Sequence, residues 1–325
     1  MIKRPIIDAV ILAGVVTGAQ AQSFRLSGEY ELNIEGGLAM PTNVSDRSLI
    51  VENNSSFTGG PAPWTVTPLV AADILDFGSI ASFATELSAG LSSGGAVFLS
   101  AQGVSGQGST DLAPHWEGLG AIPGSHDDGY LINSVWDPVA VVNTADFALT
   151  AGYSSIETAG LTWMAGVAHA VVAQDLIIDF DANPVIDGHV LVSGSSSNQM
   201  YGVTAGIGYQ RVISNDWSLG VDTNVSALQN TYDYSFDYNN FEHNTNEQVG
   251  AVGISTVVRW DVAAKLAYTL NETTALSGSI GATSYTGIVS GLDTMLNEAN
   301  TISAVSPVTS SVLLPYVRFG VSVSF

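Results

Sequence analysis

The chain has 325 residues, only 12% of them charged, with 30 acidic side chains against 8 basic ones; this excludes a nucleic-acid-binding surface, because a phosphate backbone demands lysine and arginine. Cysteine is absent, which excludes disulfides and thiolate metal sites. No segment approaches the roughly 20 apolar residues of a spanning helix, so the 34 glycines and frequent β-branched residues favour many short strands.

The first 21 residues are typical of a secretory signal peptide. Lys3 and Arg4 precede an apolar run from Ala9 to Val16, and Ala19-Gln20-Ala21 has the small-x-small form of a signal-peptidase site. A short buried helix is the alternative interpretation. The order of basic start, apolar middle and cleavage site favours a removed signal over residues 1–21 and a mature chain over residues 22–325.

Ten segments of the mature chain alternate apolar with small or polar side chains, which is the period of a strand with two different faces. In chain order they cover 24–35, 79–89, 94–104, 146–155, 160–172, 201–213, 216–228, 255–270, 274–286 and 312–325. Val66 to Asp76 and Leu131 to Val142 are candidates for further strands. We therefore expect about 10 to 12 strands, with 14 possible.

The links between these segments alternate in length. Four are short and turn-like, at 89–94, 155–160, 213–216 and 270–274. Five are longer than twenty residues, namely 36–78, 105–145, 173–200, 229–254 and 287–311. A compact soluble domain rarely needs five such loops, whereas transmembrane barrels combine tight periplasmic turns with long outer loops. The sequence therefore predicts an all-β, transmembrane, antiparallel up-and-down β-barrel with both termini in the periplasm.

Aromatic side chains mark both ends of the apolar faces. The spacings from Tyr201 to Tyr209 and from Trp260 to Tyr268 are eight residues, which cover roughly 20 Å of height in a strand tilted by about 40°. This height matches the apolar band of an outer-membrane barrel. We assign a girdle at the two membrane interfaces to Tyr201, Tyr209, Trp217, Trp260, Tyr268 and Phe325.

The opposite faces carry almost every charge within the predicted strands, because an Arg or Lys facing lipid near the midplane costs about 2–4 kcal/mol. The inward charges are Arg25, Glu29, Glu31, Glu35, Glu86, Asp222, Arg259, Asp261, Lys265 and Arg318. In one interpretation they pair and fill a narrow bore that conducts nothing. In the other they line a water-filled channel and set its ion preference. Ten strands are close to the size at which side chains can occlude the bore, so both stay open.

The terminal strand, Leu313 to Phe325, alternates throughout and ends on an aromatic residue of its apolar face, with Arg318 on the opposite face. First and last strands are neighbours in a closed barrel, which would bring Arg318 towards Glu29 and Glu31. Most of the remaining acidic residues are expected in loops, notably over Asp175 to Asp187 and Asp233 to Glu247. Such a vestibule predicts weak cation preference for a conducting pore, and alternatively it only keeps the surface soluble or binds divalent cations loosely.

Catalytic and metal-binding motifs give no support for an enzyme or a cofactor. The five histidines, at 115, 126, 169, 189 and 243, have no metal-ligand spacing. Asp179-Phe180-Asp181 followed by Asp187-Gly188-His189 resembles elements of omptin-type outer-membrane proteases, which also have ten strands; there, however, the two motifs come from separated parts of the barrel. No nucleophile elbow, P-loop or H-E-x-x-H motif is present. We expect no catalytic residue, no metal and no cofactor.

The whole mature chain resembles a Gram-negative porin-like outer-membrane barrel. The resemblance lies in the signal with its A-x-A site, the early strand FRLSGEYELNIE and the closing VRFGVSVSF. The segments ADFALTAGYSS, LTWMAGVAHAVV, YGVTAGIGYQRV, WSLGVDTNVSAL and VVRWDVAAKLAYTL are similar in pattern and order to the Legionella-type major outer membrane proteins.

What this resemblance implies is an outer-membrane pore for passive diffusion of small solutes or ions. It also implies contact with outer-membrane lipid and lipopolysaccharide, and with the barrel-assembly machinery through the C-terminal strand. A non-conducting structural or adhesive barrel is the alternative, followed by the translocator of an autotransporter. The sequence identifies no subunit interface, so the oligomeric state is left open.

Overall fold

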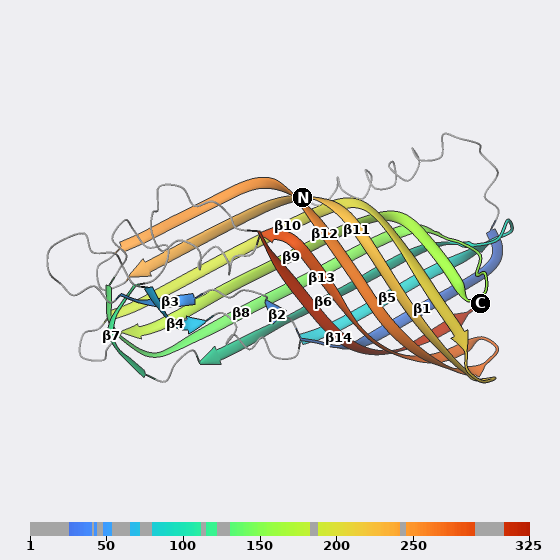
Figure 1. The fold of residues 1–325 in the computed structure, drawn as a ribbon, viewed down its shortest axis with the longest axis horizontal. Coiled ribbons are helices and arrows are strands. Elements are labelled where there is room, and N and C mark those ends of the chain that lie inside the picture. Colours follow the sequence, from blue (N-terminus) through green and yellow to red (C-terminus); the bar gives the residue numbers. More distant parts are fainter. Residues whose placement is uncertain are drawn as a thin grey trace.

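The computed structural model describes residues 26–40, 42–43, 48–53, 66–71, 80–111, 115–121, 131–182, 188–240, 245–289 and 309–325. The regular secondary structure of these residues is entirely β (Figure 1). Within these ranges, no helix is long and apolar enough to cross a membrane. The proposed signal peptide at 1–21 and the inward-charge candidate Arg25 lie outside the described residues.

Ten antiparallel strands form a closed barrel. They are β1 (Leu26–Ala39), β5 (Ile80–Leu91), β6 (Ala96–Asp111), β8 (Leu131–Ser154), β9 (Leu161–Ala182), β10 (Gly188–Val212), β11 (Trp217–Asn240), β12 (Thr245–Asn271), β13 (Thr274–Val289) and β14 (Thr309–Ser324). The ring closes because β14 pairs with β1 and β8 pairs with β9. All ten predicted strands are confirmed, and so is the up-and-down barrel.

Four shorter strands lie outside the ring. β7 (His115–Ala121) pairs with the first part of β8, β3 (Ser48–Asn53) pairs with β7, β4 (Val66–Ala71) pairs with β3, and β2 (Thr42–Asn43) pairs with β14. Of the candidate strand Val66 to Asp76, residues 66–71 form β4 and residues 72–76 lie outside the described residues, whereas Leu131 to Val142 is the first half of β8. Neither widens the ring, so the barrel has ten strands rather than twelve or fourteen.

The predicted short links are tight turns at one end of the barrel. In the β5–β6 turn, Gly94 and Gly95 have φ angles of 89° and 78°, a left-handed conformation that glycine adopts without strain. The backbone N–H of Leu91 donates to the carbonyl of Gly95 over 2.9 Å, which closes this turn. The N–H of Ile213 donates likewise to the Trp217 carbonyl over 2.8 Å.

Three of the predicted long loops are largely strand. Residues 173–182 and 188–200 continue β9 and β10, and residues 229–240 and 245–254 continue β11 and β12. Residues 105–111 and 131–145 likewise belong to β6 and β8. Asp175 and Asp233 therefore lie on paired strands, opposite Ser195 and Ser197 of β10.

In β10 and β11 the extensions were missed because their outward residues are polar, for example Gln199 and Asp233, so the hydrophobic alternation that reveals a strand is weak there. The extensions of β9 and β12 keep exposed apolar residues, namely Ile177, Val252 and Ile254, and were missed although this signal was present.

The barrel wall is consequently uneven. The strands β8 to β12 have 22 to 27 residues, whereas β13, β14, β1, β5 and β6 have 12 to 16. We call β8 to β12 the long wall and the other five strands the short side. In Figure 1 the long green to orange strands continue past the ends of the short side.

The two faces of the wall have the polarity of a barrel surrounded by lipid. Phe319 on β14 is 70% exposed on the outer face, whereas the preceding residue, Arg318, is 3% exposed on the inner face. The same inversion occurs on β1, where Ile34 is exposed and Glu35 is buried. Apolar side chains outside and charged ones inside are the reverse of a soluble core, and they place the membrane band around this part of the barrel.

Candidate functional site

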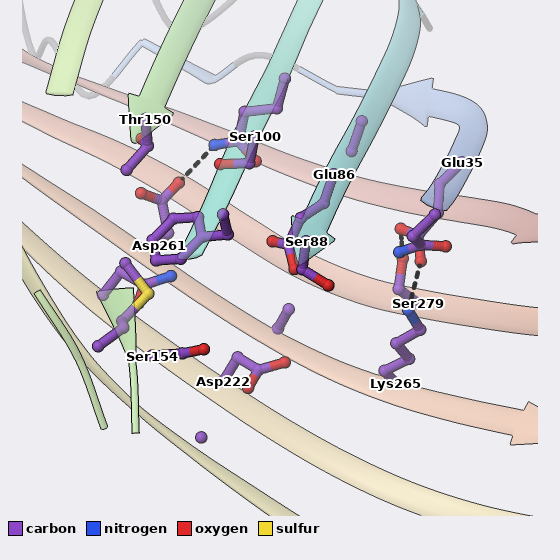
Figure 2. A pocket seen from close by; sticks show the side chains of 18 of the residues that line it. Glu35, Glu86, Ser88, Ser100, Thr150, Ser154, Asp222, Asp261, Lys265 and Ser279 are labelled. Carbon is purple, nitrogen blue, oxygen red and sulfur yellow. Dashed lines mark hydrogen bonds and ion pairs between the residues drawn. The ribbon is translucent and has the colours of Figure 1, made fainter. Parts of the chain in front are cut away.

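A polar cavity of about 510 Å³ occupies the periplasmic half of the lumen. All ten barrel strands contribute to its lining, which includes carboxylates, hydroxyls and amides together with a few apolar side chains. Figure 2 shows Glu86 and Asp222 projecting into this space together with Asp261 and Lys265. Glu31 and Glu86 are exposed, so the cavity is open to solvent.

Eight of the ten predicted inward charges line this cavity. They are Glu31, Glu35, Glu86, Asp222, Arg259, Asp261, Lys265 and Arg318. Glu29 is exposed near the periplasmic end of β1, beside Gly90 of β5. The alternation of the strands thus predicted that residues more than 280 positions apart in the chain, such as Glu35 and Arg318, face the same lumen.

Two ion pairs neutralise part of the charge. Lys265 Nζ lies 3.3 Å from Glu35 Oε1, and the Glu35 carboxylate also accepts hydrogen bonds from Ser277 and Ser279 of β13. Arg259 Nη2 lies 2.9 Å from Asp261 Oδ1. The other charged residues that line the cavity are three acids, Glu31, Glu86 and Asp222, and one base, Arg318. The cavity therefore has an excess of negative charge.

The expected approach of Arg318 to Glu29 and Glu31 is wrong. The register of β1 against β14 places Arg318 opposite Gly37, whereas Glu31 is opposite Ser324. A separation of six residues along a strand is about 20 Å, too far for an ion pair. Arg318 instead donates from Nε to Ser82 Oγ over 2.7 Å and lies over the Tyr316 ring.

Two side-chain hydrogen bonds join directly opposite walls of the bore. Gln102 Nε2 of β6 donates to Asp261 Oδ1 of β12 over 2.8 Å, and the Tyr285 hydroxyl of β13 donates to Asp146 Oδ1 of β8 over 2.7 Å. In the ring order, four strands separate the partners on either side, so each bond joins opposite walls. Asp261 also accepts from Thr283 over 2.7 Å. These groups span the lumen at the outer end of the cavity.

An apolar layer surrounds these polar groups and continues on their outer side; Ala148 and Tyr316 of this layer also line the cavity. Its members are buried and packed in one cluster: Ala39, Ile80, Val104, Ala148, Ala168, Ala170, Val172, Met200, Leu228, Val257, Tyr285, Ile288, Val312, Leu314 and Tyr316. Every barrel strand supplies at least one of them. Val257 lies nearer to the outer end of β12 than Arg259 does. In the same way, Leu314 lies nearer to the outer end of β14 than Arg318 does. The layer therefore lies in the bore above the charged groups, together with the buried amides of Asn198 and Asn230, which are hydrogen-bonded to each other.

This apolar layer and the hydrogen bonds that join opposite walls of the bore were not predicted from the sequence. Gln102, Asp146 and Tyr285 were not selected, although their inward parity could be read from the strands. The signal for the layer was present as a local loss of alternation, in the pairs Val257-Val258 and Leu313-Leu314. At these points both faces of a strand are apolar, which in a barrel indicates a buried, dry interior.

The predicted girdle residues lie on the outer face at two levels. Tyr201, Tyr209, Trp217, Trp260 and Phe325 are exposed, and Tyr268 is half-buried against the Trp217 ring, with 4.9 Å between ring centroids. Phe325 stacks on Tyr30 of β1, so an aromatic pair in the periplasmic row connects the first and last strands of the barrel.

Within the described ranges, no group of three or more His, Asp and Glu side chains could hold a metal ion. The two motifs that resemble omptin elements meet in the backbone register, because Asp181 of β9 is opposite His189 of β10.

Comparisons with known proteins place the fold. No protein-family model matches the chain, and no curated protein matches its sequence. Among solved structures, the outer membrane protease OmpT from Escherichia coli is 9% identical, with 94% of this chain and 100% of that chain covered and a TM-score of 0.51. The translocator domain of the autotransporter NalP from Neisseria meningitidis is 10% identical, covers 98% of this chain and 96% of that one, and has a TM-score of 0.38.

A Pseudomonas aeruginosa FadL homologue is 8% identical, with 91% of this chain and 90% of that chain covered and a TM-score of 0.30. At such identities the likeness concerns the fold alone, and only the OmpT score is high enough to carry that argument. The chain therefore has the fold of a Gram-negative outer-membrane β-barrel.

Proposed function

We propose that this protein is an outer-membrane barrel whose lumen is closed to passive diffusion, and that the long wall is its working surface outside the membrane. The observation that carries the proposal is the pair of hydrogen bonds joining opposite walls, from Gln102 to Asp261 and from Tyr285 to Asp146. The non-conducting structural or adhesive barrel, the second function favoured by the sequence, is therefore the one that the geometry supports best.

The apolar layer strengthens this proposal. Ions and small polar solutes cross a dry apolar constriction poorly, because they lose their hydration without gaining polar partners. The cavity below the layer then acts as a blind, water-filled vestibule. Its acidic excess would favour cations there, but it gives no through-path.

The role of the long wall is inferred from its length and polarity. Beyond the outer aromatic row, the outward side chains of β10 and β11 change to hydroxyls, amides and carboxylates such as Ser195, Gln199 and Asp233. A paired, polar extension of this kind is suited to contacts outside the membrane.

We also propose that the chain has no enzymatic activity, which a general assay with fluorescent casein would test.

The pore predicted from the sequence is the competing function, and its narrower form, a Legionella-type major outer membrane protein, stays a prediction. So do an autotransporter-type translocator and contact of the C-terminal strand with the barrel-assembly machinery. Density-gradient fractionation of expressing cells would test the location: recovery with outer-membrane markers is expected, and recovery with the inner membrane would contradict it.

Liposome swelling tests the closed lumen. Liposomes containing the refolded protein are diluted into an isosmotic solution of a small uncharged sugar, and swelling is followed by light scattering. We expect the swelling rate of protein-free liposomes. A faster rate that falls with increasing solute size would contradict the proposal and support the diffusion pore. A general porin, reconstituted at the same ratio, serves as the positive control.

A further inference from the structure

The outer end of β13 separates from its neighbour β12. The pairing of the two strands ends at Thr286, opposite Val258, although β12 continues outward as far as Thr245. Within the described part of the chain, this outer part of β12 has no strand partner on the β13 side. The pairing of β13 with β14, in contrast, continues to the last residue of β13. We call residues 287–289 the β13 tip; its backbone no longer follows the wall.

Gly287 turns the tip into the bore. Its φ angle is 91°, a left-handed conformation that suits glycine, and a Cβ at this position would lie 2.7 Å from the Thr256 carbonyl oxygen. The register of β13 against β14 shifts at the same residue. Thr286 is exposed, whereas Ile288, two residues later, is buried in the apolar layer. The outward face of β13 thus becomes an inward face at Gly287.

The side chain of Asn198 on β10 holds the tip from inside the bore. Its Nδ2 donates to the Val289 carbonyl over 2.7 Å, and its Oδ1 accepts from the Val289 N–H over 3.0 Å. One side-chain amide therefore makes the two hydrogen bonds that an antiparallel strand would exchange with this residue. In the ring order β11 and β12 lie between β10 and β13, so these bonds pass through the lumen and do not follow the wall.

Two further side chains connect Asn198 to the start of the tip. Asn230 of β11 donates to Asn198 Oδ1 over 2.8 Å and to Ser255 Oγ over 3.1 Å. Ser255 of β12 in turn donates to the Gly287 carbonyl over 3.3 Å. We call Asn198, Asn230 and Ser255 the clasp. Both asparagines are 0% exposed, so water does not compete for their hydrogen bonds in this arrangement.

A second position for the tip is available on β12. If the register that places Thr286 opposite Val258 were continued, Val289 would lie opposite Ser255. In that position the backbone of Val289 would pair with β12 in place of the Asn198 amide. The tip can therefore exchange one set of partners for another, as an element with two discrete arrangements requires.

The inward arrangement also leaves nearby polar groups without partners. Thr144, Gln174 and Ser196 are register partners on β8, β9 and β10, and Ser196 is the next inward residue beyond Asn198. Their exposed fractions are 4%, 2% and 3%, and Thr144 Oγ1, Gln174 Oε1 and Ser196 Oγ have no hydrogen-bond partner in the described part of the chain. Such groups disfavour the arrangement that buries them, and water would satisfy them in an open lumen.

We propose that the β13 tip is a releasable strap across the outer half of the lumen, with Gly287 as its hinge and the clasp as its fastening. When the clasp opens, the tip moves to the edge of β12 and water enters the outer half from outside. The proposal rests on the closed lumen of the proposed function. The hydrogen bonds of Asp146 and Asp261 across the bore stay in place, so release exposes a pocket and not a channel.

Thiol accessibility measures the release. The chain has no cysteine, so Ser196→Cys introduces a single buried thiol beside the clasp, and its labelling by a water-soluble maleimide in detergent micelles is followed by mass. We expect Asn198→Ala to accelerate labelling about tenfold or more, because two hydrogen bonds to the tip are lost. Ser255→Ala, a milder release variant, should act in the same direction. The control Asn224→Ala removes an amide that lines the periplasmic cavity and should leave the rate unchanged.

A disulfide distinguishes movement of the tip from general loosening. Thr256 is exposed outside and Ile288 is buried inside, but the two residues would lie opposite each other after the movement. In the variant Thr256→Cys with Ile288→Cys, adding Asn198→Ala should accelerate cross-linking about fivefold or more on a non-reducing gel. The mobility of unboiled protein verifies the fold.

Unchanged labelling in both release variants, equal effects of Asn198→Ala and Asn224→Ala, or no cross-link between the two introduced cysteines would each overturn the strap. Conductance of the native protein, in contrast, tests only the closed lumen, so the two proposals fail in different experiments.

Discussion

The two halves of the lumen are built from the same ten strands and the same inward parity, yet their chemistry is opposite. The periplasmic half is an open cavity with carboxylates such as Glu86 and Asp222, whereas the outer half combines an apolar layer that includes Leu228 and Val257 with uncharged buried amides such as Asn198. The difference teaches that inward parity in a barrel specifies orientation and not polarity. A charge inside such a barrel is tolerated where water or a partner reaches it.

Substitutions at the boundary between the two halves should reduce the free energy of unfolding most. Asp261 accepts hydrogen bonds from Gln102, Arg259 and Thr283, so Asp261→Ala leaves a buried guanidinium without its ion-pair partner. We expect a loss of about 3–5 kcal/mol in the free energy of unfolding, measured by urea titration in lipid vesicles. A loss below about 1 kcal/mol would show that this cluster does not hold the two walls together.

The apolar layer should behave as a packed core. Leu228 is 1% exposed, so Leu228→Ala should cost about 2–5 kcal/mol through lost burial and a residual cavity. The control is Met164→Ala, which shortens a side chain that lines the open cavity of the periplasmic half. The same urea titration should give a clearly smaller loss for Met164→Ala, and equal losses would mean that the two halves are packed alike.

Tyr285→Phe removes only the hydroxyl that reaches Asp146 across the bore. Because it leaves a buried carboxyl without this donor, we expect a loss of about 1–3 kcal/mol in unfolding free energy. If the bond acts as described, combining Tyr285→Phe with Asp146→Ala should add little to the cost of Asp146→Ala alone. Fully additive losses in this double-mutant cycle would argue against a direct interaction.

The smallest effect is expected from the ion pair in the solvated half. The Lys265 side chain is 29% exposed, whereas its partner Glu35 is 7% exposed, so removing the Glu35 charge leaves only a group that water reaches. Glu35→Gln should change the unfolding free energy by about 0–1 kcal/mol, and the effect should shrink further in high salt. A loss as large as that of Asp261→Ala would remove the distinction between the wet and dry halves.

The sequence alone predicted the parts of the molecule that depend on local alternation. The ten strands, the four turns and the inward parity of residues such as Glu35 and Arg318 follow from the period of two, because lipid on one side makes that period strong. The upper part of β10 could not be recognised in this way, because neighbouring residues on opposite faces, such as Ser195 and Ser196, are both polar. The upper part of β12 keeps exposed Val252 and Ile254, so there the alternation was present and was overlooked.

The features that depend on register and long-range packing could not be predicted, because alternation within one strand does not report how strands are aligned with one another. A shift of six residues separates the expected partners of Arg318 from the observed ones, and no single-sequence pattern reports the stagger between β1 and β14. The contact of Tyr285 with Asp146 joins opposite walls and depends on the bore diameter, which is set by strand number and shear together.

The most direct test of the closed lumen is the current through a planar lipid bilayer containing the refolded, native protein in potassium chloride. Insertion is verified beforehand by the mobility of unboiled protein on a denaturing gel. The cross-bore hydrogen bonds and the apolar layer predict a baseline without stepwise openings at moderate voltages. Reproducible unitary steps from the native chain would contradict a closed lumen and restore the diffusion pore.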